Sequence, residues 1–309
     1  MQTSHKFTHL LLFFIFLLGT LVSASAQNGF PAINVSDQQA GWMLVYPYYT
    51  SSSANAKEDS YITISNVSVS RTAAVHMFFM DGRSCAQADM FLCLTPNASQ
   101  AFKASELDPD NTGYIIAIVV NNAGEPDTTG TILIGNAFVN VPNSGIQGNY
   151  GAESFGSAGA SFNAATSQLT FNAPNRFVVE IQSPLTAPNQ RVIMVGLSGD
   201  LNGTVTGAGQ TSAGQIINGN ETPSGSFSAW IPEGCQSSGL ITSSTPRAPG
   251  GVSRIIPAGQ IGTIKFNTTA AVGLLLVPTN SSNRSGIRNI HKLGTAPTTL
   301  TVSTFLPGC

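Results

Sequence analysis

Charged side chains are scarce in this chain. They make up only 9% of its 309 residues, and it contains four histidines. Two of these, His5 and His9, lie near the N-terminus, which leaves His76 and His291 for the rest of the chain. Most enzymes work through titratable side chains whose pKa values suit the reaction, and no G-x-S-x-G nucleophile motif occurs. The scarcity argues against an enzyme, and the sequence assigns no catalytic residue.

Long hydrophobic runs are also lacking, with one exception. Residues 10–22 (LLLFFIFLLGTLV) form an apolar run of signal-peptide length, followed by small residues of the A-x-A type. The sequence therefore predicts a signal peptide over residues 1–26, cleaved before Gln27. No cysteine follows the run to carry a lipid, and the later run at residues 271–278 is too short to cross a bilayer. We expect secretion or cell-surface display, with no membrane span after leader removal.

Neither sign of charge is in large excess. The formal net charge is −2, and loss of Lys6 with the leader (−2 − 1) makes it −3. A chain this close to neutral gives no indication of binding to nucleic acid or to an anionic membrane. The partners we expect are cell-surface glycans or other surface proteins.

Cysteine is limited to four residues, which predict two disulfides in an exported protein. Three pairings are possible, and local spacing favours Cys85–Cys93 with Cys235–Cys309. A zinc site is the competing interpretation, but the sequence has no C-x-x-C spacing and no nearby histidine to support it. We therefore assign no cofactor and no metal, apart from the weak calcium candidate below.

Strand patterns dominate the remaining sequence. Residues 61–65 alternate between polar and apolar side chains, while residues 74–80 are apolar on both faces, as in a central strand. The sequence predicts an all-β fold of antiparallel β-sandwich lobes. Residues 27–145 would form an N-terminal lobe and residues 168–309 a C-terminal lobe. The Gly/Ser/Ala-rich residues 146–167 would link them.

The N-terminal part also carries a resemblance. The segments concerned are residues 41–50 (GWMLVYPYYT), 61–66 (YITISN), 74–79 (AVHMFF) and 91–96 (FLCLTP). In this order they resemble a group of uncharacterised exported bacterial proteins that open with a "YPYYT" strand. The resemblance covers about residues 41–105, and this chain departs from the group by adding Cys85 and Cys93. It implies an immunoglobulin-like exported domain and brings no catalytic residue.

Aromatic side chains gather in one predicted strand. Trp42, Tyr46 and Tyr48 would share one face and could stack on sugar rings, as could Trp230 further along the chain. The alternative is a buried strand whose tyrosine hydroxyls find partners at the sheet edge.

One acidic segment imitates half of a calcium loop. Asp108, Asp110 and Thr112 supply oxygen atoms at positions 1, 3 and 5, with a glycine at position 6. The twelfth position is Val119, where a bidentate acid would be needed. The same residues are typical of a tight turn before a strand, which is the competing interpretation.

These observations favour a secreted or cell-surface protein of structural or adhesion type, without catalytic activity. The alternative is an extracellular carbohydrate-binding module that uses an exposed aromatic strand. A hydrolase remains a third hypothesis, because a carboxylate pair such as Glu153 and Glu180 could meet only in the folded chain.

Overall fold

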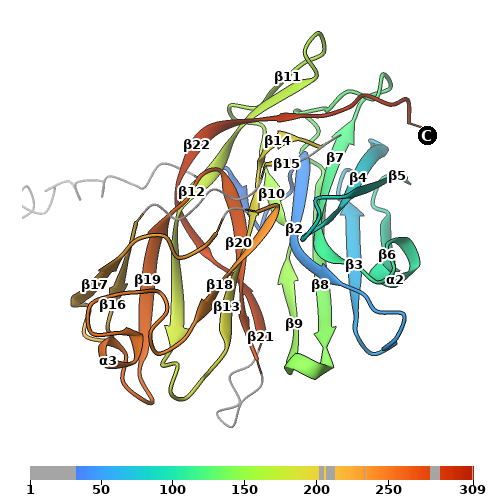
Figure 1. Ribbon diagram of the computed structural model, residues 1–309. Coiled ribbons are helices and arrows are strands. Elements are labelled where there is room, and N and C mark those ends of the chain that lie inside the picture. The colour runs from blue at the N-terminus through green and yellow to red at the C-terminus, as the bar shows by residue number, and fades with distance from the viewer. Residues whose placement is uncertain (1–32, 202–204, 207–212, 233, 279–285, 308) are drawn as a thin grey trace, which may run out of the picture. The chain divides into compact units, whose positions relative to one another are not determined.

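Nearly all regular structure in the computed structural model is β-strand, which confirms the all-β prediction (Figure 1). The structure describes residues 33–201, 205–206, 213–232, 234–278, 286–307 and 309. The predicted signal peptide, residues 1–26, lies outside these ranges. Helical structure in the described ranges is limited to α2 (Ala104–Leu107), α3 (Val252–Ile255) and the 3₁₀ turn η1 (Pro142–Ser144). Among the described residues, no helix is long and apolar enough to cross a membrane.

Two sheets come from the N-terminal half of the chain. Sheet A has the strand order β1 (Val35–Ser36), β10 (Glu153–Phe155), β2 (Met43–Thr50), β7 (Thr112–Val120), β4 (Ala73–Asp81), β5 (Gln87–Leu94). Sheet B has the order β6 (Ser99–Lys103), β3 (Asp59–Asn66), β8 (Leu133–Val141), β9 (Ile146–Gly151). We call these two sheets the N-terminal sandwich.

The other two sheets come from the C-terminal half. Sheet C has the order β15 (Val205–Thr206), β14 (Ser198–Asp200), β22 (His291–Thr301), β12 (Gln168–Gln182), β19 (Ile261–Asn267), β16 (Gly214–Ile217), β17 (Pro223–Phe227), with β11 (Ser161–Asn163) beside β12. Sheet D has the order β18 (Gln236–Ile241), β13 (Gln190–Gly196), β20 (Ala271–Val277), β21 (Gly286–Asn289). We call these the C-terminal sandwich. The described strand pairs are antiparallel, apart from the parallel pair β14–β22.

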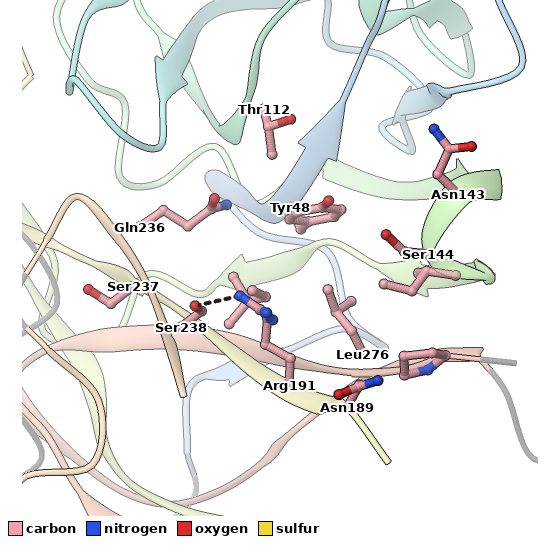
Figure 2. A pocket seen from close by; sticks show the side chains of 13 residues that line it. Tyr48, Thr112, Asn143, Ser144, Asn189, Arg191, Gln236, Ser237, Ser238 and Leu276 are labelled. Carbon is pink, nitrogen blue, oxygen red and sulfur yellow. Dashed lines mark hydrogen bonds between the residues drawn. The ribbon is translucent and has the colours of Figure 1, made fainter. Parts of the chain in front are cut away.

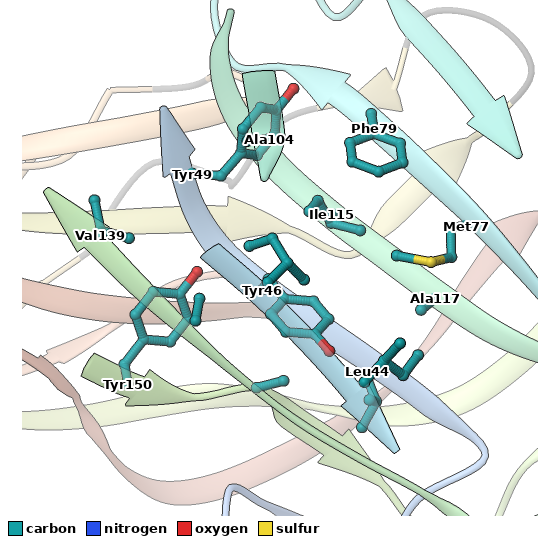
Figure 3. Packing of buried hydrophobic residues seen from close by; sticks show 14 of the residues in the cluster. Leu44, Tyr46, Tyr49, Met77, Phe79, Ala104, Ile115, Ala117, Val139 and Tyr150 are labelled. Carbon is teal, nitrogen blue, oxygen red and sulfur yellow. The ribbon is translucent and has the colours of Figure 1, made fainter. Parts of the chain in front are cut away.

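Core 1 fills the space between sheets A and B and also takes in Ile193, Leu274, Leu276 and Ile287 of sheet D. Tyr46 of β2, Met77 of β4 and Ile115 of β7 meet Val139 of β8 there (Figure 3). Sheet B buries only this side in the core, because alternate residues of a strand point to opposite faces. On its outer face Tyr61 is 47% exposed. Core 3 fills the C-terminal sandwich in the same way, between sheets C and D, and includes the following residues: Phe177, Val179, Val192, Met194, Trp230, Ile264, Phe266 and Leu275.

Core 2 joins the two sandwiches. It covers the second face of sheet A, where Met43 and Phe78 are fully buried. The residues that cover them include Phe171 of β12, Leu300 of β22 and residues of sheet D. A sheet that lies between two cores needs strands that are apolar on both faces. The sequence predicts such a strand for residues 74–80, and they lie in β4 of sheet A.

The segment expected to be a linker, residues 146–167, instead contributes three strands. β9 pairs with β8 in sheet B, β10 lies between β1 and β2 in sheet A, and β11 pairs with β12 in sheet C. Although this segment has few large apolar residues, three of them, Ile146, Tyr150 and Phe155, are buried in the cores. These few buried side chains are enough for the segment to form strands. Residues Ile33–Cys309 accordingly form a single compact unit.

The disulfide pairing differs from the sequence prediction. Cys85 is bonded to Cys235 and Cys93 to Cys309, each with its Cα atoms 5.7 Å apart. The predicted Cys85–Cys93 pair is wrong because Cys93 lies near the end of strand β5 (Gln87–Leu94), and the extended residues of that strand separate it from Cys85. A strand rises about 3.3 Å per residue, which puts the ends of this segment far beyond the reach of a disulfide. Two disulfides indicate an oxidising, extracellular type of compartment.

Candidate functional site

The aromatic strand β2 contains a β-bulge at Pro47 and Tyr48. Tyr46 pairs with Ile115 and Tyr49 with Gly113, so two residues of β2 oppose one residue of β7. Proline has no N–H to give to a ladder and is tolerated at such irregularities. The extra residue shifts the alternation: Tyr46 and Tyr49 both enter core 1, although they are three positions apart. A bulge of this kind redirects a side chain, here that of Tyr48.

Two side chains from distant strands complete the hydrogen bonding of the bulge. The hydroxyl of Tyr150 in β9 accepts a hydrogen bond from the N–H of Tyr48 at 3.3 Å and donates one to its carbonyl. Nε2 of Gln236 in β18 donates to the carbonyls of Pro47 and Gly113, at 2.7 Å each. The irregular backbone is therefore paired rather than left to solvent. Gln236 also ties sheet D to sheet A at this point.

Tyr48 lines a cavity of about 630 Å³ beside the bulge, shown in Figure 2. We call it the Tyr48 cavity. Its other lining residues come from five further segments: Thr112; Asn143, Ser144 and Ile146; Asn189, Arg191 and Ile193; Gln236, Ser237 and Ser238; Leu276 and Pro278. The volume lies within the range of small-molecule sites, and the lining combines an apolar floor with a polar rim.

Arg191 reaches the cavity because of its position on β13. Residues 191, 193 and 195 share one face of this strand, and Ile193 and Val195 enter cores 1 and 2. Arg191 lies beyond the apolar part of that face, where its Nη1 donates a hydrogen bond to Ser238 Oγ at 3.1 Å. The face thus changes along its length from packed apolar residues to a solvated cation.

The turn before Arg191 is held by a buried glutamine. Gln190 is fully buried, and its Nε2 donates to the carbonyls of Gln182 and Ala187, at 2.8 and 2.9 Å. Its Oε1 accepts the N–H of Gln182 at 3.0 Å. These bonds fix the loop that carries Asn189. The φ angle of Asn189 is positive, at 62°, and asparagine tolerates such a conformation better than most residues do. Asn189 and Arg191 therefore project from a rigid support.

The hydroxyl of Tyr48 remains protonated under ordinary conditions. Burial raises the pKa of Tyr48 to about 12, and the Glu58 carboxylate adds to the rise, while Arg191 and a hydrogen bond with Thr50 lower it. Tyr48 can therefore donate a hydrogen bond to a ligand.

The structure places the other predicted aromatic residues inside the protein. Trp42 is fully buried in core 2, and its Nε1 donates to the carbonyl of Gly156 at 2.9 Å. Tyr46 is fully buried in core 1, and Trp230 is 7% exposed in core 3. Of the four aromatic residues that the sequence suggested as a sugar-binding surface, Tyr48 is the one that lines the cavity described above. Sequence reasoning missed Arg191, Asn143, Ser144 and Asn189, which no local motif connects to Tyr48.

The residues of the predicted calcium loop do not converge on one point. Each has its own partner: Asp108 accepts from the Tyr49 hydroxyl, Asp110 accepts from Ser53, and Thr112 bonds to Thr50. Within the described ranges, no three His, Cys, Asp or Glu side chains gather as they would around a metal ion. The turn before strand β7 accounts for this sequence pattern.

The two acids considered for a hydrolase have separate cationic partners. Glu153 is 1% exposed and pairs with Lys292. Burial raises the pKa of Glu153, Lys292 lowers it, and the nearby Asp37 raises it. Glu180 lies 3.5 Å from Arg288 on the surface. Each carboxylate is thus part of its own ion pair.

His76 lies on strand β4 beside an aspartate. Its Nε2 is 2.7 Å from Asp89 Oδ2, and its ring stacks on Phe91. Burial lowers the pKa of His76, and Asp89, which raises it, offsets this only in part. Among the residues that the structure describes, no serine or cysteine hydrogen-bonds to this ring, as a histidine-activated nucleophile would.

Comparison with models of protein families, with curated proteins and with solved structures finds no match to this chain.

Proposed function

We propose that this chain is an exported, non-catalytic protein of adhesion type that recognises carbohydrate through the Tyr48 cavity. It would act at the cell surface or after secretion, released by cleavage of the leader at residues 1–26. The single observation that carries the proposal is the cavity itself: an aromatic ring, a cation and several amide and hydroxyl side chains around about 630 Å³.

The chemistry of the lining suits a sugar. Carbohydrate rings present hydroxyls, which amide and hydroxyl side chains bind, and apolar C–H faces, which pack on aromatic rings. Asn143, Ser144 and Asn189 supply the first kind of contact, and none of their side chains is engaged by another described residue. Tyr48 supplies the second kind.

The fold supports the immunoglobulin-like part of the proposal. In an immunoglobulin domain, strands B and E are neighbours in one sheet and strands C and F in the other. β3 pairs with β6 in sheet B, and β4 pairs with β7 in sheet A, in the same chain order. The places beside the B-like and F-like strands are taken by β8 and β2. We propose that the N-terminal sandwich is a rearranged immunoglobulin-like domain. The resemblance of residues 41–105 to exported bacterial proteins with a "YPYYT" strand also implies an immunoglobulin-like domain.

A glycan array probed with the full secreted chain tests this function. We expect wild-type protein to bind a subset of glycans, and Tyr48→Ala to lose that binding while its circular dichroism is unchanged. Tyr61→Ala is the matched control, because Tyr61 is exposed on the outer face of sheet B, away from the cavity.

If Tyr48→Ala does not fold, the double variant Asn143→Ala/Ser144→Ala is used instead. It removes hydrogen-bonding groups of the cavity from an exposed turn. Absence of any glycan bound by wild-type protein overturns the proposal. So does binding that depends on Tyr61 and not on the cavity residues.

A further inference from the structure

We infer that the saccharide recognised by the Tyr48 cavity carries a carboxylate, which Arg191 binds. This inference rests on the proposed function and adds the chemical class of the ligand. An acidic sugar residue, with a carboxylate at one end and hydroxyls along its ring, is the ligand that the lining fits.

The first observation is the charge of the lining. Arg191 is the one charged residue among the thirteen that line the cavity, and no Asp or Glu is among them. The Glu58 carboxylate, which acts on the Tyr48 hydroxyl from outside the lining, accepts a hydrogen bond from Thr50 Oγ1 at 3.1 Å. The lining itself thus carries one positive charge and no negative charge, which favours an anion.

The second observation is the state of the guanidinium. No described Asp or Glu side chain forms an ion pair with Arg191. Its described hydrogen bond is the one from Nη1 to Ser238 Oγ. A guanidinium has five N–H donors in a planar fork that matches a carboxylate. The bond to Ser238 orients the group and leaves donors for a ligand.

The third observation is the arrangement of neutral groups around this cation. Figure 2 shows Arg191 and Asn189 on one side of the cavity, and Tyr48 and Ser144 on the other. A carboxylate at Arg191 would leave the remaining ring between Tyr48 and the amide and hydroxyl groups of the rim. A peptide C-terminus would use the cation but few of these neutral groups, so the saccharide is the better fit.

A panel of glycans that contain uronic or sialic acids, each printed beside its carboxyl-reduced counterpart, tests the inference with the full chain. We expect the acidic form of at least one pair to bind about 10- to 100-fold more tightly than its reduced form, as for a charge-assisted hydrogen-bond pair. Arg191→Gln should abolish this preference, and higher salt should weaken it. Arg254→Gln, an exposed arginine on α3, is the control and should bind as wild type does.

The outcomes separate the two proposals. Equal binding of acidic and reduced glycans, unaffected by Arg191→Gln, overturns the carboxylate inference and leaves the carbohydrate function standing. No binding to any glycan overturns both. Binding of a peptide through its free C-terminal carboxylate, in place of any acidic glycan, also overturns the inference. Unfolding midpoints of both arginine variants, measured in parallel, show whether lost binding reflects lost structure.

Discussion

The contact between the two sandwiches has two regions of opposite character. In core 2, Phe171 is 2% exposed and makes edge-to-face contacts with Trp42 and Phe155, with ring centroids 6.0 and 5.4 Å apart. In the Tyr48 cavity, Arg191, Asn189 and Ser144 are exposed to solvent. Both regions are built from the same face of β13, where Val195 packs in core 2 and Arg191 lines the cavity.

This difference separates stability from recognition. Burial of apolar surface in core 2, together with the sheet D residues that enter core 1, holds the sandwiches together, because such burial is the main favourable term in folding. The exposed polar residues of the cavity, such as Arg191, Asn189 and Ser144, stay solvated, so they can change at little cost to stability. Changes in core 2 should therefore cost much more stability than changes at the exposed residues of the cavity.

Removal of the Cys85–Cys235 disulfide should cost more stability than any of the single substitutions below. The bond closes a loop of 150 residues between the two sandwiches, and the chain-entropy model gives about 5 kcal/mol for such a loop. We expect the double variant Cys85→Ser/Cys235→Ser to lose about this much unfolding free energy in denaturant titrations. Peptide mapping under non-reducing conditions should first find Cys85 joined to Cys235. A Cys85–Cys93 peptide would contradict the pairing.

Phe171→Ala should be a strongly destabilising single change in core 2. Loss of a buried phenylalanine leaves a cavity, and such changes cost about 4 kcal/mol. The midpoint of urea unfolding measures this, with Tyr61→Ala as an exposed aromatic control that should change stability by no more than about 0.5 kcal/mol. Equal effects of the two changes would mean that core 2 does not hold the sandwiches together.

Gln236→Leu should have an intermediate effect, since this residue lies where the packed region meets the cavity. The change removes the donors to the carbonyls of Pro47 and Gly113, and we expect a loss of about 2 kcal/mol. Gln215→Leu, on strand β16 of sheet C, is the matched control and should be nearly neutral. A neutral Gln236→Leu would show that water replaces the glutamine at the bulge.

Arg191→Gln should have the smallest effect on stability, within about 0.5 kcal/mol, because its side chain is exposed and forms no ion pair with any described residue. Thermal unfolding of the variant beside wild type measures this. A loss of 2 kcal/mol or more would show that the cavity region contributes to stability and would contradict the separation.

The sequence predicts the strands with strong apolar patterns and misses those with polar ones. Residues 61–65 and 74–80 lie within β3 and β4. The long strands β12 and β22 include Pro174 and Pro297, which argue against strands in a local view. Their mutual pairing over most of their length overrides that local preference. Such pairing is not visible in either segment alone.

The candidate site is predicted less well for the same reason. Tyr48 stands out in the sequence as an aromatic residue, but the expected shared face with Trp42 and Tyr46 is broken by the bulge at Pro47. Arg191 comes from a strand more than a hundred residues away, and only the folding of sheet D against sheet A brings it to Tyr48. The disulfide prediction is wrong for a similar reason, because local spacing favoured Cys85–Cys93, a pair that strand β5 holds apart.

Because the two sandwiches share core 2, we expect them to unfold as one unit. The chain has two tryptophans, Trp42 in core 2 and Trp230 in core 3, so Trp42→Phe and Trp230→Phe each leave one fluorescent reporter. In each variant, urea unfolding followed by fluorescence and by far-ultraviolet circular dichroism should give one transition with the same midpoint. Two transitions, in which the Trp230 fluorescence changes at a different urea concentration from the circular dichroism, would show that the sandwiches unfold separately.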